Sequence, residues 1–217
     1  MKNKKTYAVF GLGRYGYAVA RELADNGMDV IAVDLNEEVV AAASLSIPVC
    51  KCADVTDPEV LEQLGIKNVD VVIIAMAENL ESGVLAATLC KEAGVARVIV
   101  KCANEMHCKI MKRVGADEAV IPEHESGVRL ASNLMSAGFI DMISLSDDIS
   151  VVEVEVKEEW SGKSLIELDL RRKYDINVVA VKRGDEVVIS IDPKAPLDSS
   201  EKLIVIAHTA KLNGLNK

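Results

Sequence analysis

The 217-residue sequence has few aromatic residues, few histidines and no long hydrophobic run. Only 3% of its residues are Phe, Trp or Tyr, although 50% are hydrophobic, and Val, Ile, Leu and Ala supply most of them. This bias is typical of parallel sheets whose strands are buried on both faces. The longest fully apolar stretch, 71–77, has seven residues, whereas a membrane-spanning helix needs about 20. We therefore expect a globular α/β protein without a membrane span.

The sequence also lacks an excess of positive charge, with 25 Lys and Arg against 34 Asp and Glu and a formal net charge of −9. A chain of this charge repels phosphate backbones, so we expect no nucleic acid partner. The apolar run at 6–10 that follows the basic start is too short for a secretory signal. A cytoplasmic location is the resulting expectation.

The five cysteines are an odd number, and the absence of an export signal makes a disulfide framework improbable. Cys50 and Cys52 flank a lysine, and an alternating strand places both thiols on the same side of a sheet. The alternative is half of a metal site, but no second Cys/His pair completes four ligands.

Short apolar runs alternate with helical segments from residue 6 to about residue 120, as in repeated βαβ units. We predict strands at 6–10, 29–34, 47–52, 70–75, 97–101 and 118–121, and helices at 14–26, 36–45, 57–64, 79–93 and 104–114. This pattern indicates a Rossmann-like, doubly wound parallel sheet, which forms a nucleotide-binding domain over 1–122.

The pattern changes after residue 122. A helix is predicted from Glu123 to about Phe139, and 123–147 is assigned to a crossover helix and linker. Residues 151–156 alternate with period two and predict a half-exposed strand. A hairpin around Gly184 and a strand at 202–207 complete a small α/β domain over 148–217.

The segment 11–16 reads Gly-Leu-Gly-Arg-Tyr-Gly and follows the first predicted strand directly. It matches G-x-G-x-x-G in the strand–turn–helix context that the motif requires. Gly11 permits the tight turn, Gly13 lets the main chain approach a phosphate, and Gly16 allows close helix packing. The phosphate then meets the helix N-terminus, which favours anions.

Asp34 ends the second predicted strand, 23 residues after Gly11. A carboxylate at this place accepts hydrogen bonds from ribose hydroxyls and argues against NADP. The alternative is a glycine turn beside a solvent-facing aspartate. Motif, strand and acid together favour nucleotide binding.

Three charged residues bear on which nucleotide binds. Arg14 is either a contact for terminal phosphates or a solvated residue, and one loop position leaves both open. Lys101 ends the fifth predicted strand and Glu123 follows the sixth, so both lie at the edge where ligands bind in open parallel sheets. Lys101 is a candidate to neutralise phosphate, and Glu123 is the candidate metal ligand, for a cation that bridges phosphates.

The sequence shows no catalytic constellation. His107, His124 and His208 lie in polar surroundings, where a solvated or capping role is the commoner one. We therefore expect a protein that is not an enzyme. The alternative is a small NAD(H)-dependent oxidoreductase or redox sensor, because the loop and Asp34 accept NAD equally well.

The chain resembles the cytoplasmic regulatory subunits of Trk/Ktr-type potassium uptake systems, which are built from an RCK N-terminal and an RCK C-terminal domain. The resemblance covers almost the whole chain. Its motifs lie at 7–16, 33–34, 52–54, 100–101 and 115–123.

The resemblance implies an ATP or ADP site, or an NAD or NADH site, at the glycine loop. The loop would contact phosphates, Asp34 the ribose, Ala53-Asp54 and Ala75-Met76 the adenosine, and Lys101 with Glu123 the terminal phosphate and its Mg²⁺ or other bridging cation. The nucleotide-binding residues implied are Gly11, Leu12, Gly13, Arg14, Tyr15, Gly16, Asp34, Leu35, Ala53, Asp54, Ala75, Met76, Lys101 and Glu123.

The segment 165–178 looks like the RCK C-terminal signature, which in some relatives builds a dimer-interface pocket for cyclic di-AMP. Candidate contacts are Leu165, Ile166, Asp169, Arg171, Asn177, Val178 and Pro193. A purine dinucleotide needs cationic contacts and apolar shelves, which Arg171, Ile166 and Val178 supply. The alternative is a structural dimer interface alone.

The resemblance also implies partners. Homodimers would assemble into a ring, an octamer or a tetramer, beneath a membrane potassium channel or transporter subunit. The ring would associate peripherally with the inner face of the membrane.

Overall fold

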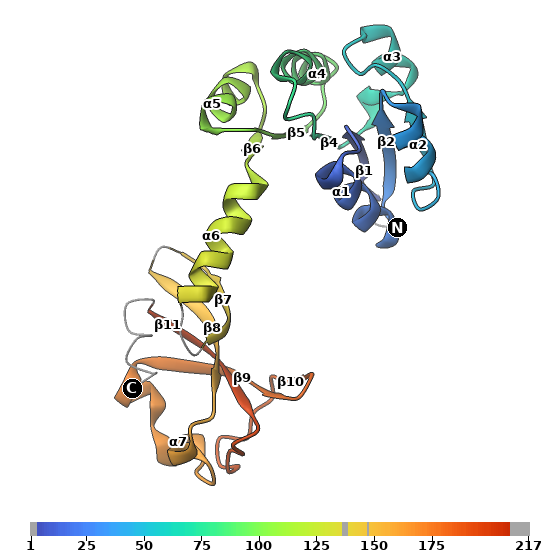
Figure 1. Ribbon diagram of the computed structural model, residues 1–217. Helices are drawn as coiled ribbons and strands as arrows, with labels where there is room; N and C mark the ends of the chain where they lie inside the picture. Colours follow the sequence, from blue (N-terminus) through green and yellow to red (C-terminus); the bar gives the residue numbers. More distant parts are fainter. Residues whose placement is uncertain (1–3, 136–138, 147, 209–217) are drawn as a thin grey trace. The chain divides into compact units, whose positions relative to one another are not determined.

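The computed structural model describes residues 4–135, 139–146 and 148–208. The chain divides into two compact units, Met1–Glu123 and His124–Lys217, which are drawn in blue to green and in yellow to red in Figure 1.

The first unit is built on a six-stranded parallel sheet with the strand order β3-β2-β1-β4-β5-β6. The predicted doubly wound sheet is confirmed. Its strands are β1 (Thr6–Phe10), β2 (Asp29–Asp34), β3 (Cys50–Cys52), β4 (Val71–Ile74), β5 (Arg97–Lys101) and β6 (Glu118–Val120). The order reverses between β1 and β4, and ligands of open α/β sheets bind at such a switch point, beyond the carboxyl ends of the strands.

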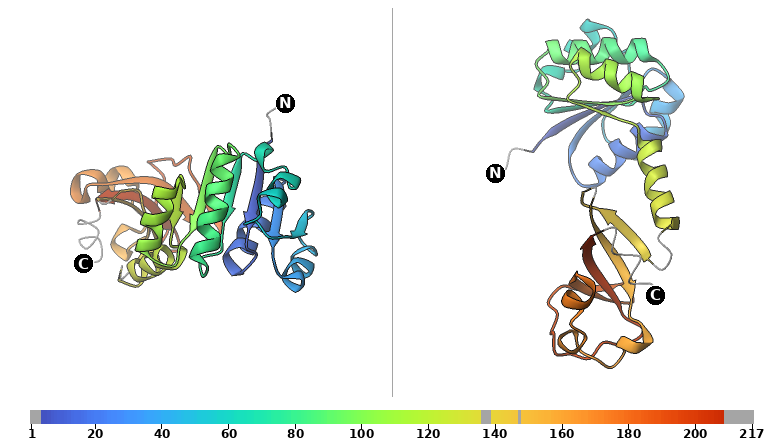
Figure 2. Two further views of the ribbon diagram at one scale, coloured as in Figure 1. Left: turned by 90° about the horizontal axis from the view of Figure 1, so that it is seen from above. Right: turned by 90° about the vertical axis from the view of Figure 1, so that its left-hand side faces the viewer.

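Helices cover both faces of this sheet (Figure 2). They are α1 (Arg14–Asp25), α2 (Glu37–Ala43), α3 (Pro58–Gln63), α4 (Leu80–Glu92) and α5 (Glu105–Val114), with a 3₁₀ turn at Ile66–Asn68. Successive residues of β1 face opposite cores, because side chains alternate along a strand. Val9 packs with Ala20 of α1, whereas Phe10 packs with Ala86 of α4.

Two helices of the first unit begin at residues whose side chains cap them. The Asp57 side chain accepts the Glu59 N–H at 2.9 Å, and Pro58 occupies the first turn of α3. Asn79 caps α4 by accepting the Ser82 N–H at 3.0 Å. Both side chains satisfy N–H groups that have no partner within the helix.

The second unit contains a five-stranded antiparallel sheet with the order β10-β9-β11-β8-β7. Its strands are β7 (Phe139–Ser144), β8 (Ile149–Glu155), β9 (Ile176–Arg183), β10 (Glu186–Val188) and β11 (Lys202–His208). Its helices are α6 (Pro122–Met135), α7 (Leu165–Leu168) and α8 (Leu170–Tyr174). The first two residues of α6 belong to the first unit. A 3₁₀ turn spans Glu158–Trp160. Alternate strand residues such as Val152, Val154 and Leu203 pack with Trp160 in one core.

Two predicted elements differ from the structure by three or more residues at one end. The strand predicted at 47–52 starts only at Cys50, because the Ile47 N–H donates to Ala43 O at 2.9 Å and prolongs the helical turn of α2. The helix predicted to reach about Phe139 ends at Met135, and β7 follows it. Pairing of Met142 with Val152 and of Ser144 with Ser150 explains this strand, which the local sequence does not indicate.

The prediction that β8 is half-exposed is wrong at Glu153, which is only 7% exposed. Its Oε2 lies 2.8 Å from Lys182 Nζ, and its Oε1 lies 3.0 Å from Lys202 Nζ. The alternation of apolar and polar residues predicts that the Glu153 side chain faces solvent. The two lysines, on β9 and β11, pair with the carboxylate and thus allow it to be buried.

Candidate functional site

The loop between β1 and α1 is shaped by its first and third glycines. Gly11 has φ +86°, and its N–H donates to Val33 O at 2.8 Å. A Cβ on Gly16 would lie 1.9 Å from Gly11 O, so no larger residue fits without a shift of the backbone. A Cβ on Gly13 would meet nothing within 4 Å. The loop is therefore crowded at its two ends and open at its centre.

The open centre of the loop lies at the N-terminus of α1. Gly13 is the N-cap of this helix, and it has no side chain to satisfy the first N–H groups. The first turn contains no acidic residue. The positive end of the helix thus meets open space at Gly13, as an anion site requires.

Asp34 ends β2 beside this loop. Its Oδ2 accepts the Leu12 N–H at 2.6 Å, and its Oδ1 accepts the Asn36 N–H at 2.9 Å. Its main-chain oxygen accepts the Ala53 N–H at 3.0 Å. Asp34 is therefore half-buried and bonded to the loop, rather than facing solvent.

Lys101 and Glu123 lie next to the helix end of the loop. Lys101 Nζ is 2.6 Å from Glu123 Oε1 and 5.6 Å from the centre of the Tyr15 ring. The hydrogen bond from Lys101 lowers the pKa of Glu123, and the charge of Arg14 acts in the same direction. The structure thus groups Arg14, Tyr15, Lys101 and Glu123 at one end of the glycine loop.

The remaining predicted residues border the same edge of the sheet. The Ala75 N–H donates to Phe10 O at 2.7 Å, and Met76 Cγ lies where a Cβ on Gly11 would need space. Leu35 is 69% exposed. The Asp54 carboxylate accepts the hydroxyl and the N–H of Thr56, which lower its pKa, so it is held on its own turn.

Two buried cysteines of the first unit are poor nucleophiles. Burial raises the pKa of the Cys90 thiol to about 12, and burial with a contribution from Cys108 does the same for Cys102, which leaves both thiols unreactive. No group of three or more His, Cys, Asp or Glu side chains suits a metal ion in the described ranges. A cation at Glu123 would therefore need phosphate oxygens as further ligands.

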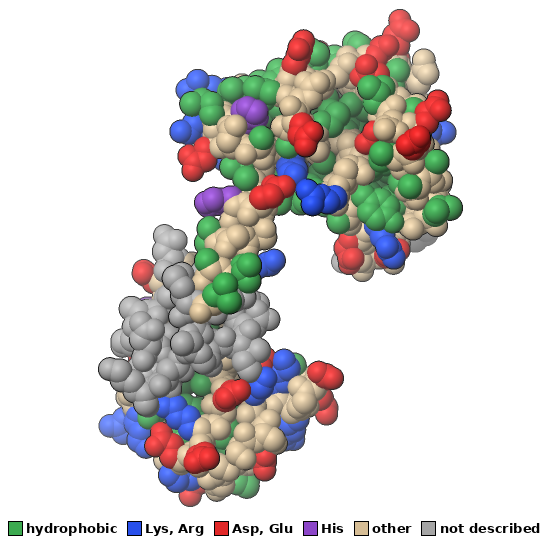
Figure 3. All heavy atoms as spheres, viewed as in Figure 1, with side chains coloured by type: hydrophobic (Ala, Val, Ile, Leu, Met, Phe, Trp, Pro, Cys, Tyr) green, Lys and Arg blue, Asp and Glu red, His purple; other side chains and the backbone are tan. Residues whose placement is uncertain are grey.

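Acidic and basic side chains are interspersed on the face shown in Figure 3. In the part of the chain that the structure describes, no helix combines the length and the apolar character needed to cross a bilayer.

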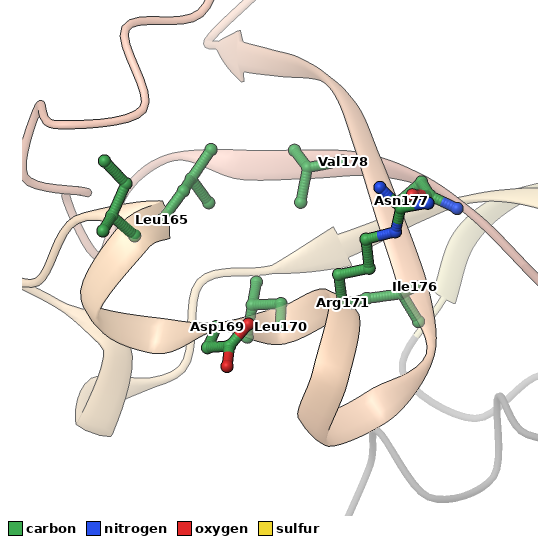
Figure 4. Close-up of a pocket in the computed structure, with 8 residues that line it drawn as sticks. Leu165, Asp169, Leu170, Arg171, Ile176, Asn177 and Val178 are labelled. Atoms are coloured by element: carbon green, nitrogen blue, oxygen red, sulfur yellow. The ribbon is translucent and has the colours of Figure 1, made fainter.

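The second unit contains a cavity of about 380 Å³ between α7, α8 and the start of β9. Its lining residues are Leu165, Ile166, Asp169, Leu170, Arg171, Ile176, Asn177 and Val178. In Figure 4 the Arg171 side chain reaches toward Asn177, Leu165 lies on the far side, and Val178 lies between Leu165 and Asn177. Six of the seven candidate contacts thus share one cavity.

The seventh candidate, Pro193, is not part of this lining, although its carbonyl oxygen accepts the Ile166 N–H at 3.2 Å. Sequence reasoning missed two lining residues, Leu170 and Ile176. Asp169 has φ +44° at the corner between α7 and α8, and this corner turns the chain around the cavity. The sequence signal for these two positions is weak: each is an apolar residue that flanks the segment 171–175.

Comparisons with known proteins agree with the geometry of both units. The TrkA-N domain model matches residues 7–122, and the TrkA-C domain model matches residues 150–217. The Ktr system potassium uptake protein C of Bacillus subtilis is 36% identical over 99% of this chain and 97% of its own length. The Ktr system potassium uptake protein A of the same organism is 34% identical over 96% of this chain and 93% of its own length.

Solved structures support the fold. The RCK domain of GsuK has a TM-score of 0.51 at 21% identity and covers 98% of this chain and 46% of its own. The GsuK channel bound to NAD has a TM-score of 0.52 at 21% identity, over 99% of this chain and 38% of its own. With both domain models matched in order and relatives aligned over nearly their whole length, the chain belongs to the TrkA-N/TrkA-C family that includes the Ktr and Trk potassium uptake proteins.

Proposed function

We propose that this protein is a nucleotide-sensing regulatory subunit of a Trk/Ktr-type potassium uptake system and not an enzyme. The observation that carries the proposal is the open glycine loop at the N-terminus of α1, with Asp34 on one side and the Lys101–Glu123 pair on the other. We assign the nucleotide-binding domain to 1–122 and the C-terminal domain to 148–217; the segment 123–147 connects them and contains most of α6 and also β7, which pairs with β8.

The residues present fit an adenine nucleotide such as ATP or ADP. The backbone at Gly13 has room for phosphate, since a Cβ there would meet no atom within 4 Å. Asp34 accepts hydrogen bonds from the ribose hydroxyls with the lone pairs that Leu12 and Asn36 leave unused. Leu35, Ala53, Asp54, Ala75 and Met76 border the adenosine.

We assign the discrimination between ATP and ADP to Arg14, Lys101 and Glu123. Lys101 bonds Glu123 at 2.6 Å and can exchange this bond for one to a terminal phosphate. Glu123 then becomes available to a cation such as Mg²⁺ on the same phosphates. A ligand shifts a conformational equilibrium only through such differential contacts.

The regulatory output is a change in the shape of an assembly. Homodimers form a ring, an octamer or a tetramer, on the cytoplasmic face of a membrane potassium channel or transporter subunit. The family membership and the relatives named as Ktr potassium uptake proteins support this partner.

Calorimetric titration with ATP, ADP and NADH, with and without Mg²⁺, tests the proposal. We expect the wild-type protein to bind ATP and ADP with different cation dependence. Arg14→Ala and Lys101→Ala should each reduce the preference for ATP by about tenfold, because a charge-assisted contact to phosphate is lost. Lys109→Ala, which removes an exposed lysine of α5, is the matched control.

Two outcomes would contradict this assignment. An Arg14→Ala protein that still distinguishes ATP from ADP as the wild type does would remove Arg14 from the discriminating site. Exclusive binding of NADH would instead favour the NAD(H)-dependent redox sensor or small oxidoreductase, which the loop and Asp34 accommodate equally well.

The cavity of the second unit is proposed as a second ligand site, for cyclic di-AMP. Arg171 offers a cation, and Ile166 and Val178 offer apolar surface within the same cavity. This combination suits a ligand with both phosphates and purine rings.

A further inference from the structure

Asp34 connects two loops at the carboxyl edge of the parallel sheet. One carboxylate oxygen accepts the Leu12 N–H of the β1–α1 loop at 2.6 Å, and the other accepts the Asn36 N–H before α2 at 2.9 Å. Leu12 directly precedes Gly13, where the loop is open. A displacement of the carboxylate therefore moves the backbone next to the proposed phosphate position.

We infer that Asp34 is a positioning residue for the phosphate-binding loop, in addition to its ribose contact. This inference rests on the proposed nucleotide site. It assigns to Asp34 a role in phosphate affinity, although the ligand contact proposed for its side chain is with the ribose. The two oxygens hold the loop and the start of α2 in one arrangement, so that the N-terminus of α1 is preorganised for an anion.

Burial of the loop makes the hydrogen bond from Leu12 consequential. Leu12 is 4% exposed, and a buried N–H without an acceptor is costly. The Gly11 N–H donates to Val33 O at 2.8 Å. This neighbouring hydrogen bond fixes only Gly11, the residue before Leu12. Without the carboxylate oxygen, the loop has to rearrange at Leu12 to find another acceptor.

Removal of the Asp34 charge should change phosphate affinity in opposite directions, depending on whether electrostatic repulsion or loop positioning dominates. A carboxylate near phosphates repels them, so its neutralisation alone should strengthen phosphate binding. Loss of positioning should weaken phosphate binding. The sign of the change in phosphate affinity therefore separates the two effects.

The test compares adenosine with ATP in the wild type and in Asp34→Asn, by calorimetry. Both ligands share the ribose and only ATP carries phosphates, so the ratio of their affinities isolates the contribution of the phosphates. A role at the ribose alone predicts equal losses for both ligands and an unchanged or increased preference for ATP. Positioning predicts that the preference for ATP falls by about tenfold, because the asparagine amide replaces one acceptor oxygen by a donor.

Two further variants and one spectroscopic signal complete the test. Glu37→Gln removes a negative charge from the exposed first turn of α2 and should keep the wild-type ratio. Asp34→Glu keeps both oxygens but displaces them by one methylene group, and it should also lower the ratio; it replaces Asp34→Asn should that variant not fold. The Leu12 amide proton resonance, assigned by NMR, should move upfield in either variant.

The outcomes distinguish this inference from the proposed function. A wild-type protein that does not bind ATP overturns the proposed function. An unchanged ratio in a folded Asp34 variant, or an unchanged Leu12 amide resonance, overturns the positioning role alone.

Discussion

At the scale of single residues, Gly16 and Gly13 belong to one motif but differ in their surroundings. A Cβ on Gly16 would lie 1.9 Å from Gly11 O and 3.0 Å from Ala75 Cβ, whereas a Cβ on Gly13 would reach open space. Gly16 serves the fold, because helix and strand approach closely there, whereas Gly13 leaves room for a ligand.

This difference predicts opposite phenotypes for two alanine variants. Gly16→Ala should lower the free energy of unfolding by about 1–3 kcal/mol, because the added methyl group overpacks the loop. Gly13→Ala should cost less than about 1 kcal/mol, at a helix N-cap, yet weaken ATP binding at least about tenfold. Urea unfolding followed by circular dichroism and ATP titration measure both effects. A Gly13→Ala protein with wild-type ATP affinity would show that phosphate does not approach this position.

The sequence predicts the residues of the glycine loop better than their hydrogen bonds. The motif is local, so Gly11, Gly13 and Gly16 are recognisable without a structure. The bond from Leu12 to Asp34 spans 22 residues and depends on how β1 and β2 pair. Such a contact follows from the register of strands, which the sequence pattern does not state.

At the scale of elements, regular helices and strands of the first unit follow from hydrophobic periodicity and capping residues. β7 does not, because its pairing with β8 rather than its own pattern makes it a strand. The burial of Glu153 on β8 likewise depends on contacts with other strands. Its partner Lys182 lies 29 residues further along the chain, so its burial is not visible in the alternation of 151–156.

The ion pairs of Glu153 predict a dependence of stability on pH. Burial alone would raise the pKa of Glu153, but the hydrogen bonds and charges of Lys182 and Lys202 outweigh burial and lower it below the ordinary 4.5. A carboxylate with a lowered pKa in the folded state stabilises the fold above its unfolded pKa. This contribution is lost as the pH falls from about 4.5 through the lowered pKa.

Glu153→Gln should therefore be less stable than the wild type at pH 7, by about 1–3 kcal/mol, and should lose less stability on acidification. Fluorescence of Trp160, the single tryptophan, reports unfolding of this core. Glu155→Gln, two residues along the same strand and exposed, is the matched control. Parallel pH profiles for wild type and Glu153→Gln would contradict a charged Glu153 in the folded protein.

At the scale of the whole molecule, the chain carries two candidate sites in two compact units with separate cores. A ligand that binds only the folded state stabilises the unit that holds its site, by an amount set by the ratio of ligand concentration to Kd. The two sites are therefore separable by their effects on unfolding. Trp160 lies in the core of the second unit, so its fluorescence follows the cavity lined by Arg171 rather than the glycine loop.

Cyclic di-AMP at about one hundred times its Kd should stabilise the transition reported by Trp160 by about 2.7 kcal/mol. Arg171→Ala should abolish most of this stabilisation, because its cation lines the cavity, and should leave ATP binding unchanged. Lys173→Ala is the matched control, since Lys173 is an exposed cation of α8 that does not line the cavity. Equal losses in Arg171→Ala and Lys173→Ala would indicate attraction by overall charge rather than a cavity contact. No stabilisation of the wild type would leave the cavity as a structural feature of the TrkA-C domain.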